Sequence, residues 1–168
     1  GSRGIPNKYG GFEQFAEYVS VGMVNSGHEV TVYSPHFHEY KKNTFKGVHI
    51  IHKKCFESKL GSSAHFFYDY ICLKDALQKG YDIILELGYQ SVAISYLLLP
   101  IKKSIIVTNM DGLEWKRDKW SPLVKKITKW FEKLGAEKSH YLVSDNKGIK
   151  DYLFNAYGKV SDMIPYGA

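Results

Sequence analysis

The stretch Tyr9–Tyr33, YGGFEQFAEYVSVGMVNSGHEVTVY, decides the fold class of this chain. It opens with two adjacent glycines, continues with apolar residues at helical spacing, breaks at Asn25-Ser26-Gly27 and ends in a β-branched run. The apolar stripe, spaced i, i+3, i+4, i+7 and i+11, consists of Phe12, Phe15, Ala16, Val19 and Met23. A glycine-rich turn, a helix and a strand in this order are typical of an α/β protein.

The rest of the chain repeats this alternation. Strands are predicted at 28–33, 48–52, 82–87, 104–108, 140–143 and 162–164, and helices at 11–25, 62–78, 91–99, 122–136 and 146–157. Ser121, followed by Pro122, and Asp145 are the predicted N-caps of the last two helices. The pattern predicts a Rossmann-like fold: a doubly wound, mostly parallel sheet with helices on both faces, in three layers.

Composition favours one globular domain over residues 1–168. The chain is 44% hydrophobic and 24% charged, which is enough for a core. The longest apolar run, at 96–101, is too short to cross a bilayer, and no signal-peptide pattern is present. Cys55 and Cys72 lie in apolar surroundings, which fits reduced thiols. We therefore expect a cytoplasmic protein.

Both ends of the sequence suggest that this domain belongs to a longer chain. A doubly wound sheet places its first strand directly before a glycine turn of this kind, so we expect a strand ahead of residue 1. At the other end, Ile164-Pro165-Tyr166-Gly167-Ala168 reads as the exit from a last strand into a further segment.

Positive charge is concentrated in one segment. The net charge is +6, and residues 116–138 hold eight Lys or Arg against three acids, a local charge of +5. Such a field favours an anionic partner: nucleic acid, an acidic lipid surface or a phosphorylated substrate. No nucleic-acid-binding motif accompanies the segment, so we expect no nucleic acid partner.

The helix within this basic segment is amphipathic. Its apolar face consists of Leu123, Ile127, Trp130, Phe131 and Leu134, and lysines at i, i+4 and i+8 are Lys125, Lys129 and Lys133. Helices of this kind lie on anionic membranes, which predicts a membrane-facing role for the three lysines. An ordinary crossover helix with its apolar face on the sheet and its lysines in water gives the same pattern.

Two local features indicate ligand-binding chemistry. The turn at Gly10-Gly11 leads into a helix N-terminus, whose free N–H groups and positive dipole suit a phosphate, although the glycines could serve only to let the chain bend. Asp111 follows the strand predicted at 104–108, so it lies at the carboxyl edge of the sheet, where α/β proteins bind ligands. The alternative is that Asp111-Gly112 is simply a turn.

Four motifs, in this order, resemble a known family: Arg3-Gly4-Ile5-Pro6, Tyr9-Gly10-Gly11-Phe12-Glu13, Asn109-x-Asp111-Gly112-x-Glu114-Trp115-Lys116-Arg117 and Ile164-Pro165-Tyr166-Gly167-Ala168. Together they resemble the N-terminal domain of bacterial family-four glycosyltransferases of the two-domain B fold, in the rhamnosyltransferase-like subgroup. That resemblance implies two Rossmann-like domains facing each other across a cleft. This chain would be the acceptor-side domain, and the nucleotide-sugar-binding domain would lie outside it.

The resemblance places the glycine turn against the donor phosphate and sugar, so the predicted donor-side residues are Gly10, Gly11, Phe12, Glu13 and Arg3. The predicted acceptor-binding residues are Glu114, Trp115, Arg117 and Glu86. The indole of Trp115 offers a flat face for stacking on a sugar ring, although it could equally cover the core, and Glu86 could simply mark a strand that has reached solvent. Asp111 would be the catalytic carboxylate, acting as general base if the reaction inverts the anomeric carbon, or orienting the acceptor and stabilising positive charge if it retains it. The sequence leaves both open.

The implied function is transfer of a sugar such as rhamnose from a nucleotide-sugar to a lipid-linked saccharide acceptor in surface polysaccharide synthesis, a hexosyltransferase reaction. Peripheral attachment to the inner face of the plasma membrane follows from a polyprenyl-diphosphate-linked acceptor. The chain alone is expected to be inactive, because the donor-binding domain lies outside it.

No metal or other cofactor is expected. His49 and His52 lie on opposite faces of the predicted strand at 48–52, which disfavours joint chelation, and no Asp-x-Asp motif occurs. Two other classes remain open: a non-catalytic module that binds anions or membranes, and a domain of an NAD-dependent oxidoreductase. The second lacks the G-x-G-x-x-G fingerprint.

Overall fold

The computed structural model describes residues 2–165 and divides the chain into two compact units, Gly1–Cys72 and Leu73–Ala168. Helix α3 (Ala64–Lys79) contains the boundary between them. Residues 166–168 of the last motif lie outside the described residues.

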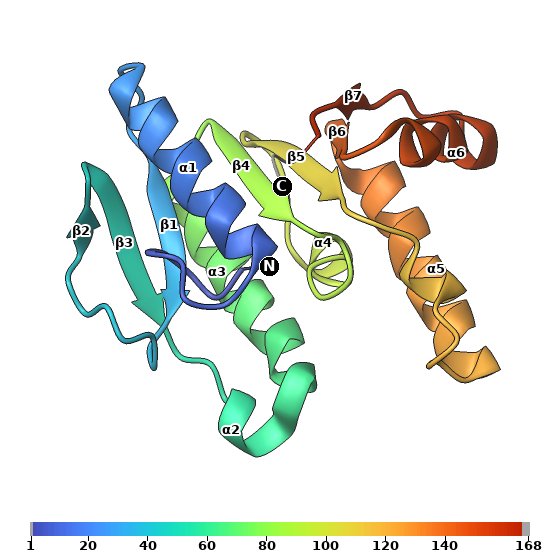
Figure 1. Ribbon diagram of the computed structural model, residues 1–168, viewed down its shortest axis with the longest axis horizontal. Helices are drawn as coiled ribbons and strands as arrows, with labels where there is room; N and C mark the ends of the chain where they lie inside the picture. Colours follow the sequence, from blue (N-terminus) through green and yellow to red (C-terminus); the bar gives the residue numbers. More distant parts are fainter. Residues whose placement is uncertain (1, 166–168) are drawn as a thin grey trace. The chain divides into compact units, whose positions relative to one another are not determined.

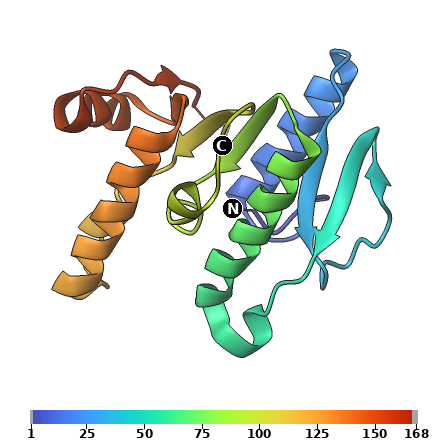
Figure 2. The ribbon, with the colours of Figure 1, turned by 180° about the vertical axis from the view of Figure 1, so that it is seen from behind.

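The first unit is a small sheet with a helix on each face. It contains α1 (Gly11–Asn25), β1 (Thr31–Pro35), β2 (Thr44–Phe45), β3 (Val48–Lys53), α2 (Glu57–Leu60), the 3-10 turn η1 (Gly61–Ser63) and the first part of α3. The strand order is β1-β3-β2, with β1 parallel and β2 antiparallel to β3. Helix α1 lies in front of β1 in Figure 1, and α3 lies in front of it when the molecule is seen from behind in Figure 2.

The second unit is an all-parallel sheet flanked by helices (Figure 1). It contains β4 (Ile83–Leu87), α4 (Ser95–Leu98), β5 (Ile105–Met110), η2 (Glu114–Lys116), α5 (Pro122–Lys138), β6 (Tyr141–Ser144), α6 (Lys147–Tyr157) and β7 (Asp162–Met163). The strand order is β4-β5-β6-β7. Its core includes Tyr89, Met110, Phe131, Leu134 and Leu153, all at most 8% exposed.

These units confirm the predicted fold class, a Rossmann-like α/β architecture with helices packed on parallel strands. Every predicted strand and every predicted helix has a counterpart, and α1 has the predicted bounds. Ser121 caps α5 as predicted, accepting from the Val124 N–H, with Pro122 at the first helical position.

Two local predictions were wrong and one strand was missed. The N-cap of α6 is Asn146, whose side chain accepts from the Ile149 N–H, not Asp145. The helix predicted at 91–99 shortens to α4 preceded by turns. Strand β2 was not predicted, because a two-residue strand joined to β3 through the Lys46-Gly47 turn carries too few residues for a periodic signal.

The buried face of α1 differs from the predicted apolar stripe. Its buried residues are Glu13, Ala16 and Ser20, whereas Met23 is 38% exposed. The apolar spacing located this helix correctly but did not show that its inner face carries a carboxylate.

Helix α5 presents part of its apolar face to solvent. Phe131 and Leu134 are buried as predicted, but Leu123 is 68%, Ile127 42% and Trp130 46% exposed. Within residues 2–165, no helix is both long enough and apolar enough to span a membrane.

Candidate functional site

The carboxyl ends of β4, β5 and β6 form one edge of the parallel sheet in the second unit. Met110 at the end of β5 pairs with Ser144 at the end of β6, so Asp111 and Asp145 leave adjacent strands at the same level. This edge is where ligands bind in open α/β sheets. The structure therefore places Asp111 where the sequence predicted it, and adds Asp145, which the sequence analysis treated only as a helix cap.

The pKa of Asp111 is raised toward neutral pH. Burial, and after it the neighbouring negative charges of Glu114 and Asp145, raise the pKa of its carboxyl group to about 6, against the lowering effect of a hydrogen bond from its own backbone. A carboxyl group with this pKa changes its proton occupancy close to physiological pH. Such a group can take up a proton from a substrate hydroxyl and release it again.

Glu114 and Arg117, both predicted to bind the acceptor, bind each other. Arg117 Nη1 donates to Glu114 Oε1 at 2.6 Å, and the indole of Trp120 donates to Glu114 Oε2 at 3.3 Å. The Arg117 side chain is 57% exposed, so its other N–H groups face solvent. The ion pair joins two residues that are three positions apart in the loop after β5.

The indole ring of Trp115 makes contacts through both its N–H edge and its face. Its indole N–H donates to Glu132 Oε2 at 3.0 Å, and the ammonium of Lys129 lies 4.4 Å from its ring centroid. A second cation, Lys116, lies 5.4 Å from the ring. The indole predicted to stack on a sugar is therefore already in contact with two cations and a buried carboxylate.

Glu86 lies inside β4, beside Thr108 of β5. It is half-buried, and its register position is three residues below that of Asp111. Of the residues predicted for the acceptor, it is therefore the one set back from the carboxyl edge.

The glycine turn belongs to the first unit. Gly10 is the N-cap of α1 with an extended backbone, and no side chain caps the helix. Both glycines are exposed, and Phe12 is half-buried. The sequence predicts a phosphate at this turn, and the structure shows no side-chain cap there.

Glu13 faces inward rather than toward the turn's surface. It is 7% exposed, and its Oε1 accepts the Arg3 backbone N–H at 2.6 Å. One helical turn later, Glu17 Oε2 accepts the Asn7 N–H at 2.8 Å. The two carboxylates fasten the segment before α1 to the helix.

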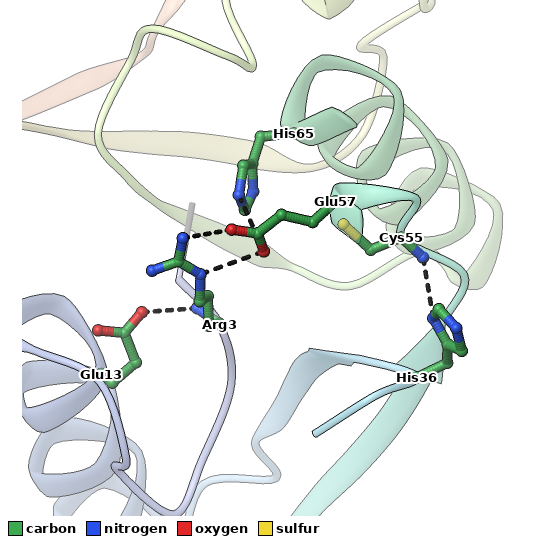
Figure 3. A network of polar contacts seen from close by, with 6 residues as sticks. All are labelled: Arg3, Glu13, His36, Cys55, Glu57 and His65. Atoms are coloured by element: carbon green, nitrogen blue, oxygen red, sulfur yellow. Dashed lines mark hydrogen bonds and ion pairs between the residues drawn. The ribbon is translucent and has the colours of Figure 1, made fainter. Parts of the chain in front are cut away.

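The guanidinium of Arg3 is engaged by Glu57 (Figure 3). Its Nη2 lies 2.5 Å from Glu57 Oε1 and its Nε donates to Oε2 at 3.3 Å, while His65 approaches the same carboxylate at 3.6 Å. The hydrogen bonds from Arg3 hold the pKa of Glu57 below its ordinary value. Arg3 is predicted to contact the donor phosphate. Because Glu57 already binds its guanidinium, a phosphate there would share that guanidinium with the Glu57 carboxylate.

The three lysines predicted to face a membrane all have partners within the second unit. Lys125 pairs with Asp118 at 3.7 Å, Lys133 pairs with Glu137 at 3.7 Å, and Lys129 covers Trp115. Lys129 and Lys133 remain largely exposed, so their positive charge still reaches the surface of α5.

Three histidines of the first unit have backbone partners. His36 Nδ1 accepts the Cys55 N–H at 3.1 Å (Figure 3), His38 Nδ1 accepts the Tyr40 N–H at 3.1 Å, and His52 Nε2 lies 2.9 Å from the Tyr40 carbonyl oxygen. Among residues 2–165, no three His, Cys, Asp or Glu side chains gather in a way that could hold a metal ion.

Sequence reasoning missed the group that organises this region. Glu132 is fully buried in α5 and accepts hydrogen bonds from Trp115, Tyr152 and Tyr157. An acid within an apolar helical face was its only signal, and the lysines around it obscured that signal.

Comparisons with known proteins address the family. No curated protein sequence matches the chain. A family model described as a domain of unknown function (DUF1972) matches residues 1–168. The chain therefore belongs to the DUF1972 family, which is known as an N-terminal domain of glycosyltransferases.

Proposed function

We propose that this chain is the acceptor-side domain of a hexosyltransferase, which moves a sugar such as rhamnose from a nucleotide-sugar to a lipid-linked saccharide in surface polysaccharide synthesis. The observation that carries the proposal is Asp111, a partly buried carboxyl group with a pKa of about 6 at the carboxyl edge of a parallel sheet. Family membership supports the same reaction class.

In this reaction a hydroxyl oxygen of the acceptor bonds to the anomeric carbon while the bond to the nucleoside diphosphate breaks. The hydroxyl proton needs an acceptor. In an inverting reaction the Asp111 carboxylate takes it; in a retaining reaction the departing phosphate takes it, and Asp111 orients the acceptor and stabilises positive charge at the sugar.

The glycine turn would contribute to the donor side. The start of α1 has no side-chain cap and carries the positive end of the helix dipole, which suits a diphosphate, and Arg3 adds positive charge within the same unit. No metal is part of the proposal, because N–H groups and a cation are themselves suited to stabilise the leaving phosphate.

The proposal is tested on a longer protein that carries this domain together with its donor-binding domain. Asp111→Asn preserves the shape of the side chain but removes the base, and we expect kcat to fall by about 10²–10⁴-fold. Asp82→Asn is the matched control, because Asp82 is exposed at the opposite, amino end of the β4 strand. Equal activity of the wild type and the Asp111 variant would reject the proposal.

The pH dependence of the wild type separates the two mechanisms. If Asp111 is the base, kcat/KM falls as the pH drops through about 6, because the carboxylate becomes protonated. If the phosphate accepts the proton, that limb is absent and the Asp111 variant retains part of its activity.

A second proposed property is cytoplasmic, peripheral attachment to an anionic membrane through α5. The exposed side chains of Leu123, Ile127 and Trp130, next to exposed lysines, support it. Cosedimentation with anionic and neutral vesicles tests it: Leu123→Ser with Trp130→Ser should reduce binding to anionic vesicles, whereas Phe154→Ser, an equally exposed apolar residue of α6, should not. Unchanged binding of the α5 double variant would reject the α5 surface.

A further inference from the structure

Glu132 is a carboxyl group in the middle of the second unit's core. Its exposed fraction is 0%, and its neighbours along α5, Phe131 and Leu134, belong to the apolar cluster. A buried carboxylate is strongly unfavourable unless hydrogen bonds replace its lost hydration. The structure supplies those hydrogen bonds from three different parts of the chain.

Only donors surround the two oxygens of Glu132. Tyr152 and Tyr157 of α6 donate to Oε1 at 2.6 and 2.7 Å, and Trp115 of η2 donates to Oε2 at 3.0 Å. Burial, and after it the hydrogen bond to Glu132, raise the pKa of Tyr152 to about 12, so its hydroxyl stays a donor. Charge-assisted bonds of this kind are the stronger hydrogen bonds of proteins.

Two of the bonds around Glu132 secure the loop that begins at Asp111. Trp115 is four residues beyond Asp111, and its segment η2 packs against α5 (Figure 1). Tyr89 lies 3.4 Å from Glu132 Oε2 and donates its hydroxyl proton to the carbonyl oxygen of Gly112 at 2.8 Å. The residue directly after Asp111 and the indole of Trp115 are therefore both tied to this buried group.

Gly135 lets α5 approach Tyr89 closely enough for these hydrogen bonds to form. A Cβ at this position would lie 2.8 Å from the Cβ of Tyr89, which real side chains do not allow. Because Gly135 is one turn from Glu132, the close approach brings the carboxylate level with the Tyr89 hydroxyl.

We propose that Glu132 is the positioning residue for Asp111: by binding Trp115 directly and Gly112 through Tyr89, it fixes the loop that carries the functional carboxylate. The inference rests on the proposed function, in which Asp111 acts on the acceptor. Glu132 itself is buried beneath the loop and is assigned no contact with substrate.

The test titrates Asp111 in the chain itself, by carbon-13 NMR of its carboxyl group. The wild-type midpoint is expected near 6. In Glu132→Gln the amide cannot accept from all three donors, so the loop loosens and water reaches Asp111. We expect its midpoint to fall by about 1 unit toward the ordinary aspartate value.

Tyr157→Phe is the matched control. It also removes one donor from Glu132, but that donor lies in α6 and makes no link to the Asp111 loop. Both variants should lose stability, and only Glu132→Gln should move the Asp111 midpoint. A purely structural role for Glu132 would lower stability in both and leave Asp111 unchanged, which would overturn the proposal.

Trp115→Phe provides a second measurement should Glu132→Gln fail to fold. It leaves the buried carboxylate with its tyrosine donors and removes the direct hydrogen bond to the loop, so the Asp111 midpoint should again fall. A midpoint within about 0.3 unit of the wild type would contradict the proposal. The titration needs no substrate; absence of sugar transfer would therefore reject the proposed function without changing this result.

Discussion

Asp111 combines burial with like-charged neighbours, and both disfavour its ionised form. A surface aspartate in a turn would keep an ordinary pKa and would be almost fully ionised at neutral pH. The raised value means that the folded chain binds a proton that the unfolded chain has already released. The protein therefore loses stability by keeping this carboxylate charged.

This cost predicts a pH-dependent gain in stability for Asp111→Asn. Between about pH 4 and pH 6 the native state binds more protons than the unfolded state, so wild-type stability falls as the pH rises through that window. At neutral pH the variant should be more stable by about 1–3 kcal/mol, because the shift is about two units. Below about pH 4 the gain should disappear, since both states are then protonated.

Urea unfolding at several pH values measures this difference. A constant difference across the pH range would show that Asp111 does not have the raised pKa on which the catalytic assignment depends. Asp82→Asn serves again as the control, since Asp82 is exposed.

Arg3 and Glu13 make structural contacts at positions where the family resemblance implies donor binding. The family resemblance places both near a donor phosphate, yet Glu13 binds the Arg3 backbone and Glu57 binds the Arg3 side chain (Figure 3). These contacts hold the segment before α1 in place, so the glycine turn begins from a fixed position.

At the scale of elements, the two halves of α5 differ in burial. Thr128, Phe131 and Gly135 face the core, whereas Leu123 and Ile127 are exposed near the start of the helix. The second half of α5 therefore stabilises the fold, while its first half remains available to a partner surface.

Two helical glycines should respond in opposite ways to alanine. Gly135→Ala places a methyl group 2.8 Å from Tyr89 Cβ and should destabilise the chain by about 1–3 kcal/mol. Gly22→Ala in α1 meets nothing within 4 Å and should stabilise it by about 0.5–1 kcal/mol, because alanine has the higher helix propensity. Thermal or urea unfolding of both variants measures the contrast, and a stabilised Gly135 variant would contradict the close approach described for α5.

At the scale of the whole molecule, charge determines which surfaces the chain approaches. The net charge is +6 and the isoelectric point about 9.1, with most of the excess between residues 116 and 138. Long-range attraction to anionic surfaces follows from this distribution and requires no particular side-chain geometry.

Salt dependence separates charge from apolar contact in vesicle binding. Raising the ionic strength from about 0.1 M to about 1 M shortens the screening length from about 10 Å to about 3 Å, so the lysine contribution should largely disappear. The contribution of Leu123, Ile127 and Trp130 should remain. Complete loss of binding at high salt would assign the attachment to charge alone.

The fold was predictable because its signals are local. Apolar spacing located α1, and β-branched runs located β3, β4 and β5, since each pattern reflects the period of its own element. Asp111 was predictable for the same reason: a polar residue directly after a buried parallel strand lies at the carboxyl edge whatever the rest of the chain does.

What the sequence determined by itself is the order of strands and helices, the position of Asp111 at a strand end and the concentration of positive charge before and along α5. Only the tertiary structure decided which partners the polar groups take: Glu132 with Trp115 and two tyrosines, Glu57 with Arg3, and Asp145 beside Asp111. Each of these groups joins residues distant in the sequence or on different elements. Periodicity describes which face of an element is buried, but hydrogen bonds and pKa shifts depend on what packs against that face.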